Sequence, residues 1–338
     1  MNRCRSLPAL LAGLIAVAGL AAAAHAAPGY ALEDRIAIPD GGFDYVSFDP
    51  VRRRLYVSRS NGITAVDLDS KAVTGRLITA GRTHEPLVVQ GGAELLVTDS
   101  TSNSAHLVDA ATGKAIAEIP TGKKPDAAVL DPATGLAVVA NGAGGDLTLI
   151  DVAARKVVGT IAVGGALEFM APVEGGRLYV NIEDKGQIAE VDLKARKLIA
   201  SRPMTGCEEP SGLAYAPHAG VLIAACANNV AKVVRASDGA DLMTLAIGKG
   251  PDAVVFDADR KLAFIPCGRD GELDVIAVES AKDIRVIAKV STQTGARTAA
   301  LDPKSGKLYL PTAKYTANPG EKPTATPGSF EVLVVGPK

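Results

Sequence analysis

Residues 45–79 read YVSFDPVRRRLYVSRSNGITAVDLDSKAVTGRLIT, and this stretch decides the fold. It holds four short runs rich in Val, Ile, Leu and Ala, separated by Gly, Pro, Asp, Asn and Ser. Runs of this kind predict four β-strands joined by tight turns. No long run of the chain shows an apolar period of 3.6 residues, so helices are not expected.

The same unit returns along the chain, for example as AAVLDPATGLAVVANGAGGDLTLIDVAARKVVGTIAV at 127–163. The position of Asp49 recurs every 40 to 45 residues, at Gln90, Asp131, Ala171, Ala216, Asp257 and Asp302. Four strands in a repeat of this length are typical of one propeller blade. The sequence therefore predicts an all-β fold, a seven-bladed β-propeller of four-stranded blades. Six or eight blades are the alternative, because the units at 165–205 and 297–336 are irregular.

The repeat region begins with a strand that belongs to no complete unit and ends with a unit that lacks one strand. Residues 32–38 resemble a fourth strand that has no first three strands before it. The last unit has runs at 298–301, 307–311 and 330–335 and lacks a fourth. An open blade would leave an unpaired strand edge. We therefore expect the N-terminal strand to join the last blade and close the ring.

The first 26 residues have the pattern of a signal peptide. Arg3 and Arg5 precede an apolar run at 7–20, and Ala24-His25-Ala26 is a cleavage signal. The sequence predicts cleavage near Ala26, export to the periplasm or medium, and one domain over 27–338. A retained amphipathic anchor helix is the alternative.

Composition narrows the functional classes. The 338 residues include 36 basic and 37 acidic ones and no Trp. This balance argues against charge-driven nucleic-acid binding and against a polytopic membrane protein. We expect no integral membrane segment after removal of the signal, and a monomer.

Three cysteines remain after the signal, an odd number for an oxidising compartment. Cys207 precedes the first strand of the fifth unit and Cys226 ends its second strand. Antiparallel pairing brings these positions together, so we expect a Cys207–Cys226 disulfide. Cys267 lies one repeat after Cys226, which makes Cys226–Cys267 the rival pairing.

Several strings resemble the YVTN-repeat (YncE-like) propeller family, over essentially the whole chain after the signal. They are Leu55-Tyr-Val-Ser, Leu178-Tyr-Val-Asn, the Gly-x-x-Pro-Asp strings at 122–126 and 248–252, Tyr179-Val-Asn-Ile-Glu-Asp-Lys185, Cys207-Glu-Glu-Pro-Ser-Gly212 and Gly295-Ala-Arg-Thr298. The last three are similar to an exported subgroup. The resemblance implies a seven-bladed propeller, usually without an assigned biochemical role. Some members resemble propellers encoded with quinoprotein systems, and one relative is associated with DNA binding.

Functional groups of propellers gather on the face that carries the loops entering the first strands, here called the upper face. The residue five places before each Asp49-like position forms a series: Asp44, Glu85, Asp126, Ala166, Ser211, Asp252 and Arg297. Glu168, Glu208 and Glu209 lie close to this series, and Asn181, Glu183, Asp184 and Lys185 lie in one loop between second and third strands. Clustered carboxylates with one Arg favour a polar ligand or a divalent cation such as calcium. The alternative is that these Asp residues only form turns.

The first functional hypothesis is a non-catalytic propeller that binds a small ligand or a periplasmic partner protein on the upper face. No cofactor motif is present apart from the carboxylates that could hold a cation. The second hypothesis is a lactonase-like enzyme using His84, Glu168, Glu183 and Arg297 for acid–base work and charge stabilisation. Binding of single-stranded nucleic acid is the third and weakest. The segment 312–329 is predicted to be a flexible loop that covers the same face or docks a partner.

Overall fold

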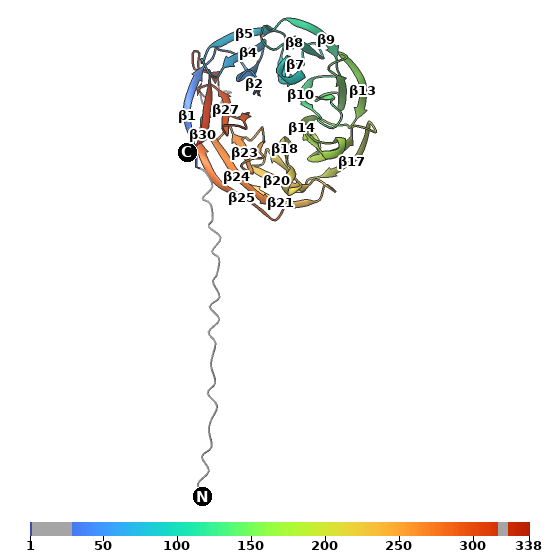
Figure 1. The fold of residues 1–338 in the computed structure, drawn as a ribbon, viewed down its shortest axis with the longest axis vertical. Helices are drawn as coiled ribbons and strands as arrows, with labels where there is room; N and C mark the ends of the chain where they lie inside the picture. The colour runs from blue at the N-terminus through green and yellow to red at the C-terminus, as the bar shows by residue number, and fades with distance from the viewer. Residues whose placement is uncertain (2–28, 317–323) are drawn as a thin grey trace.

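The chain forms seven four-stranded antiparallel sheets arranged in a ring around a central channel (Figure 1). The structure, a computed structural model, describes residues 29–316 and 324–338 together with Met1. The predicted seven-bladed β-propeller is confirmed. The signal sequence predicted for 1–26 lies, apart from Met1, outside the described residues.

Blades 1 to 6 each consist of four consecutive strands, running from the channel outward. Blade 1 has β2 (Phe43–Asp49), β3 (Arg54–Arg59), β4 (Gly62–Asp67) and β5 (Val73–Thr79). Blade 2 has β6 (Thr83–Val89), β7 (Glu94–Asp99), β8 (Ser104–Asp109) and β9 (Ala115–Pro120). Blade 3 has β10 (Pro125–Leu130), β11 (Ala137–Asn141), β12 (Asp146–Asp151) and β13 (Lys156–Ala162).

The second half of the ring repeats this order. Blade 4 has β14 (Leu167–Val173), β15 (Arg177–Ile182), β16 (Gln187–Asp192) and β17 (Lys197–Pro203). Blade 5 has β18 (Pro210–Ala216), β19 (Val221–Cys226), β20 (Val230–Arg235) and β21 (Asp241–Ala246). Blade 6 has β22 (Val255–Asp257), β23 (Leu262–Cys267), β24 (Glu272–Ser280) and β25 (Asp283–Ser291).

Blade 7 joins the two ends of the chain. Its strands from the channel outward are β26 (Ala300–Asp302), β27 (Lys307–Thr312), β30 (Glu331–Pro337) and β1 (Tyr30–Ala37). β1 pairs antiparallel with β30 through partners such as Ile36 and Val332. The predicted closure by the N-terminal strand is confirmed, and in Figure 1 β1 and β30 lie side by side near the C-terminus.

Within 312–329, two short strands form a hairpin where the sequence predicted only a loop. β28 (Tyr315–Thr316) pairs with β29 (Thr324–Ala325), and the residues between them, 317–323, lie outside the described part of the chain. Four single 3₁₀ turns complete the elements: η1 (Gln90–Gly92), η2 (Glu174–Gly176), η3 (Glu183–Lys185) and η4 (Pro217–Ala219).

The apolar core is divided into seven clusters, one between each pair of neighbouring blades. Second strands are covered on both faces, which explains continuous apolar runs such as β19, where all six residues are buried. The Tyr of the Leu-Tyr-Val string packs between blades. Tyr56 donates to the carbonyl of Ala110 and Tyr179 to that of Ala236, both at 2.8 Å. These bonds tie blade 1 to blade 2 and blade 4 to blade 5.

The repeated Asp residues at the ends of first and third strands form turns. Asp49 Oδ1 accepts a hydrogen bond from the amide of Val51 at 2.9 Å, and Asp67 Oδ1 accepts one from Ser70 at 2.8 Å. Asp satisfies turn amides in this way. Among the described residues, no helix is long and apolar enough to cross a membrane.

Candidate functional site

A repeated bulge in the first strands changes the direction of the side chains beside the channel. In β2 the register shifts between Phe43 and Val46, so two residues lie opposite the single Ser58 of β3. β6, β10, β14 and β18 carry the same shift. Bulges redirect side chains and recur next to functional sites. The first residue of each bulge, with its equivalents in blades 6 and 7, defines what we call the axial ring: Asp44, His84, Asp126, Glu168, Ser211, Asp252 and Arg297.

The five-residue count from the sequence is correct in five blades and wrong in two. In blades 2 and 4 the count assigned Glu85 and Ala166 to the series. The first strands of these blades end at Val89 and Val173, one residue before and two residues after the strand ends assigned from the sequence. The equivalent residues are therefore His84 and Glu168. Both were named as candidates in the sequence, but neither was placed in the series.

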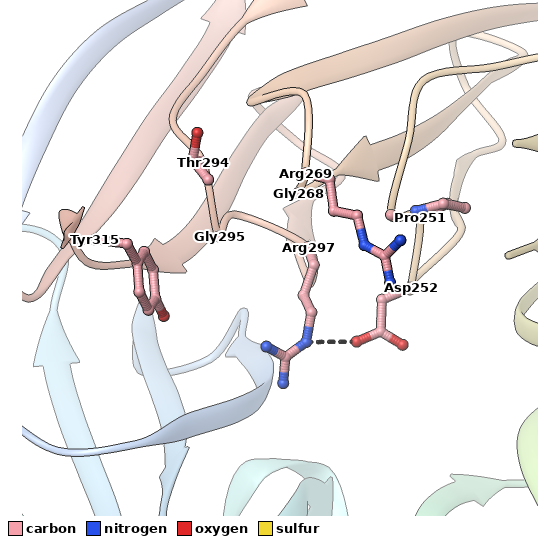
Figure 2. Close-up of a pocket in the computed structure, with 9 residues that line it drawn as sticks. Pro251, Asp252, Gly268, Arg269, Thr294, Gly295, Arg297 and Tyr315 are labelled. Carbon is pink, nitrogen blue, oxygen red and sulfur yellow. Dashed lines mark hydrogen bonds and ion pairs between the residues drawn. The ribbon is translucent and has the colours of Figure 1, made fainter. Parts of the chain in front are cut away.

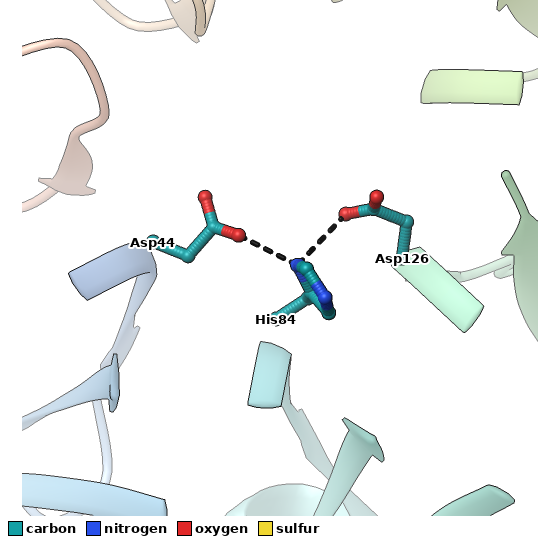
Figure 3. A group of neighbouring side chains, drawn as sticks. All are labelled: Asp44, His84 and Asp126. Carbon is teal, nitrogen blue, oxygen red and sulfur yellow. Dashed lines mark hydrogen bonds and ion pairs between the residues drawn. The ribbon is translucent and has the colours of Figure 1, made fainter. Parts of the chain in front are cut away.

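His84 is buried between two carboxylates that lie on opposite sides of its ring (Figure 3). Its Nδ1 is 2.6 Å from Asp44 Oδ2 and 3.3 Å from Asp126 Oδ1. Its Nε2 is 3.0 Å from Ser100 Oγ. Nδ1 therefore contacts both carboxylates, and Nε2 contacts the Ser100 hydroxyl. The imidazole is held through both nitrogens, and His84 is the second residue of strand β6 rather than part of a free loop.

Arg297 joins three blades at the same level. Its Nε donates to Asp252 Oδ2 at 2.7 Å, and its Nη2 lies 3.7 Å from Asp44 Oδ1. Its guanidinium stands over the ring of Phe43, 5.5 Å from the centroid. Arg297 is thus paired with two acids of the axial ring, Asp252 and, more distantly, Asp44.

Burial raises the pKa of several acids in the ring, and neighbouring carboxylates add to the effect. For Glu168 the pKa rises to about 8, with Asp126 and Asp252 contributing after burial. For Asp252 it rises to about 6, although Arg297 opposes the rise. Burial also raises the pKa of Asp126, against the effect of His84. At neutral pH the ring therefore holds Glu168 as an acid and Asp252 mostly as a carboxylate.

Two aromatic side chains cross the channel below the ring. Tyr45 and Phe169, the second residues of the bulges in blades 1 and 4, pack edge to face with centroids 4.7 Å apart. Further along the first strands of blades 1, 2, 6 and 7 lies a mostly apolar cavity of about 470 Å³, lined by Ser47 and Leu87 among others. Glu85 accepts a hydrogen bond from Ser47 Oγ at 2.7 Å, and burial raises its pKa to about 8. Glu85 is thus a channel residue, but it is not part of the ring.

Beside Arg297 lies a cavity of about 380 Å³ between blades 6 and 7 (Figure 2). Arg269 and Asp252 lie on one side of it and Tyr315, from strand β28, on the other. The complete lining is Gly250, Pro251, Asp252, Gly268, Arg269, Thr294, Gly295, Arg297 and Tyr315. The sequence indicated Asp252 and Arg297 among these polar residues, but not Tyr315, which belongs to the hairpin β28–β29.

The glycines of this lining make room for its functional side chains. Gly295 has φ +93°, and a Cβ there would lie 2.4 Å from the ring of Tyr315. A Cβ at Gly268 would lie 2.9 Å from Cβ of Arg297. Substitution at either position would displace a side chain that lines the cavity. The Gly295-Ala-Arg-Thr string noted in the sequence is therefore part of this site.

The remaining candidates of the upper face have mixed environments. Asn181 is buried, and its Nδ2 donates to the carbonyls of Ser211 and Gly212 at 2.9 and 3.1 Å, so its amide group ties blade 4 to blade 5. Asp184 Oδ1 accepts from the amide of Ala166 at 2.8 Å, which is turn chemistry. Burial raises the pKa of Glu183, and Glu209 adds to the rise. Lys185 and Glu208 are exposed.

The predicted Cys207–Cys226 disulfide is present. Pro210, at the start of β18, pairs with Cys226 at the end of β19, so antiparallel pairing brings the two cysteines together as expected. The rival Cys226–Cys267 pairing is wrong. Cys267 is a buried free thiol, 3.5 Å from Asp274 Oδ2.

Asp44, His84 and Asp126 also offer ligand atoms for a metal, all within 4.8 Å of one another. Calcium prefers six to eight oxygen ligands, whereas mixed imidazole and carboxylate sets suit zinc and other transition metals. The residues present therefore fit a transition metal better than the calcium considered from the sequence. A bound cation would replace the hydrogen bond between His84 and Asp44.

No family model matches the chain, and no curated protein matches it. Solved structures similar to the chain include hydrazine synthase of Kuenenia stuttgartiensis, with 17% identity, a TM-score of 0.68 and coverage of 86% of this chain and 96% of that chain. A chain of the mitotic checkpoint complex has 13% identity, a TM-score of 0.72 and 98% coverage of both chains. U3-55K has 8% identity, a TM-score of 0.74 and coverage of 90% and 98%. At these identities the likeness shows the propeller fold alone.

Proposed function

We propose that this protein is an exported propeller of the YVTN-repeat type that binds a small organic anion in the cavity beside Arg297, without catalysis. The observation that supports it is the charge of the lining. The lining contains two arginines, Arg269 and Arg297, and one acid, Asp252, and the cavity volume of about 380 Å³ suits a small molecule. Arg pairs with carboxylates through two parallel hydrogen bonds, so a carboxylate is the favoured ligand group.

The surroundings favour recognition over a purely structural role. Asp252 occupies Nε of Arg297, while Arg269 forms no ion pair within the described parts of the chain. Tyr315 offers an aromatic face across the cavity, and Thr294 contributes a polar side chain beside it. A ligand with an anionic group and a small apolar body matches this combination.

The test is binding of a panel of small carboxylates to the mature protein, followed by thermal unfolding and calorimetry. A ligand at a hundredfold excess over its Kd should raise stability by about 2.7 kcal/mol. We expect Arg269→Gln to abolish the response and Arg76→Gln, an exposed Arg on the outer strand β5, to preserve it. Equal responses of the two variants, or no response to any carboxylate, would refute the proposal.

The lactonase-like enzyme remains the second candidate, because of His84 and Glu168. An imidazole fixed between two carboxylates is suited to proton transfer, and an acid with a pKa of about 8 can donate a proton at neutral pH. Hydrolysis of simple aliphatic lactones, assayed with zinc or calcium and again with EDTA, tests this function. Activity that is lost in both His84→Gln and Glu168→Gln would replace the binding proposal.

Export is part of the proposal and rests on the sequence of residues 1–26 together with the disulfide. Disulfides persist in oxidising compartments. N-terminal sequencing of the protein recovered from the periplasm should begin near residue 27. An intact Met1 would contradict export by a cleaved signal. Binding of single-stranded DNA is disfavoured by the acids of the axial ring and is checked by its dependence on salt concentration.

A further inference from the structure

A second cavity, of about 280 Å³, opens between blades 1 and 2, on the other side of Asp44 from the site just described. It is lined by Gly42, Phe43, Asp44, Arg59, Ser60, Arg82 and Thr83. Nothing in the proposed function uses it. Its unusual member is Arg59, the last residue of strand β3.

Arg59 is a buried charge without a counter-ion. Only 3% of the residue is exposed, and burial lowers its pKa to about 10. Its Nη2 donates to the carbonyls of Pro39 and Gly41, at 2.5 and 3.0 Å, whereas its Nη1 is buried with no hydrogen-bond partner. Within the described residues it forms no ion pair. An unpaired buried guanidinium is costly, so a fold rarely keeps one without a reason.

The chain is shaped around this guanidinium. Gly41 has φ +140°, and a Cβ there would lie 3.1 Å from Nη2 of Arg59. The ring of Phe330 lies beneath the guanidinium, 5.3 Å from centroid to Cζ. The nearest acid, Asp40, instead accepts hydrogen bonds from the amide of Gly328. The protein therefore positions Arg59 tightly while leaving its charge uncompensated.

The lining as a whole, with two Arg and one Asp, carries a net positive charge. Arg82 is exposed, and its side chain has no ion pair within the described residues. Asp44 is the one acid, and it is already engaged by His84 at 2.6 Å and by Arg297 at 3.7 Å. Ser60 adds a hydroxyl. Two guanidiniums and a hydroxyl are the donor set that binds an oxyanion.

We propose that this cavity is a second anion site, which takes the oxyanion group of a small molecule, a carboxylate or a sulfate-like group, between Arg59 and Arg82. The bound anion supplies the counter-ion that the buried Arg59 lacks. The site does not depend on the cavity beside Arg297, because the two share no lining residue.

The test uses sulfate and acetate as separate probes, titrated calorimetrically at constant ionic strength set with chloride. All titrations use the Arg269→Gln protein, so that the cavity beside Arg297 does not contribute. We expect saturable binding of at least one probe, weakened roughly tenfold or more by adding Arg82→Gln, since a charge-assisted hydrogen bond is lost. Adding Arg76→Gln should leave the affinity unchanged.

Arg59→Gln should abolish binding, and circular dichroism establishes whether that variant folds. If the Arg59→Gln variant does not fold, the Arg82→Gln variant still tests the proposal, because Arg82 is exposed. Binding of sulfate alone would identify a tetrahedral oxyanion as the ligand group, and binding of acetate alone a carboxylate. Absence of saturable binding of both probes, or binding that is equal in the Arg82→Gln and Arg76→Gln proteins, would overturn the proposal.

Discussion

Glu85 should make the protein less stable as the pH rises, and Glu85→Gln should remove that loss. The carboxyl lies in the channel, where burial raises its pKa from 4.5 to about 8 and Asp44 and Asp126 reinforce the rise. Below pH 4.5 both the folded and the unfolded chain carry the proton. Between 4.5 and about 8 the unfolded chain loses it and the folded protein keeps it, so stability falls.

The size of the change in unfolding free energy follows from the width of this pH interval. Each pH unit within it changes the free energy of unfolding by at most about 1.4 kcal/mol, so the ceiling at pH 7 is about 3.4 kcal/mol. Relaxation and water entry reduce such penalties in real proteins. We therefore expect Glu85→Gln to stabilise the protein by about 1–3 kcal/mol at pH 7 and by almost nothing at pH 4. Gln retains an oxygen that accepts the hydrogen bond from Ser47.

Urea unfolding of the disulfide-intact protein at several pH values measures the effect. The slope with respect to urea should be unchanged, because the surface exposed on unfolding is the same. Glu168 titrates in the same window, so part of the pH dependence should survive in the variant. Glu279→Gln, at an exposed position of β24, is the control. A Glu85→Gln protein that keeps the full pH dependence of the wild type would refute the reasoning.

Three further predictions concern the framework of the site. Replacing Cys207 and Cys226 by Ala should lower stability by about 3 kcal/mol, measured by urea unfolding without reductant, because the disulfide closes a loop with a sequence separation of 19. Gly295→Ala should lower stability by about 1–3 kcal/mol and weaken carboxylate binding in calorimetry, since φ is +93° and the new Cβ would press on Tyr315. Asn181→Ala should cost about 1–3 kcal/mol in thermal unfolding, because two carbonyls of the next blade lose their donor; a neutral result would return Asn181 to the list of ligand-binding residues.

Much of the architecture could be predicted because it is local. The turn-forming Asp49 and Asp67, the Leu-Tyr-Val strings and the apolar second strands all act within one blade or between neighbours. The disulfide could be predicted for the same reason, since antiparallel pairing of adjacent strands fixes which positions meet.

The axial ring could be predicted only in part. Its members were found by counting from assumed strand ends, and the count failed in blades 2 and 4, where the first strands end one residue before and two residues after the assumed positions. In blade 2 the error of one residue selects a side chain that points in the opposite direction, because successive side chains of a strand alternate. The bulges that bring Asp44, His84 and Asp126 together also leave no clear mark in composition.

The amino-acid sequence alone indicated the number of blades, the closure of the ring and the disulfide. The blades and the disulfide depend on pairing of adjacent strands, and the closure follows because the first and last units each lack the strands that the other supplies. Only the tertiary structure decided that His84 lies between two carboxylates, that Tyr315 lines the cavity beside Arg297, and that Arg59 is buried without a counter-ion. These features join side chains from different blades. Their burial, and hence their charge and chemistry, exists only once the ring is closed.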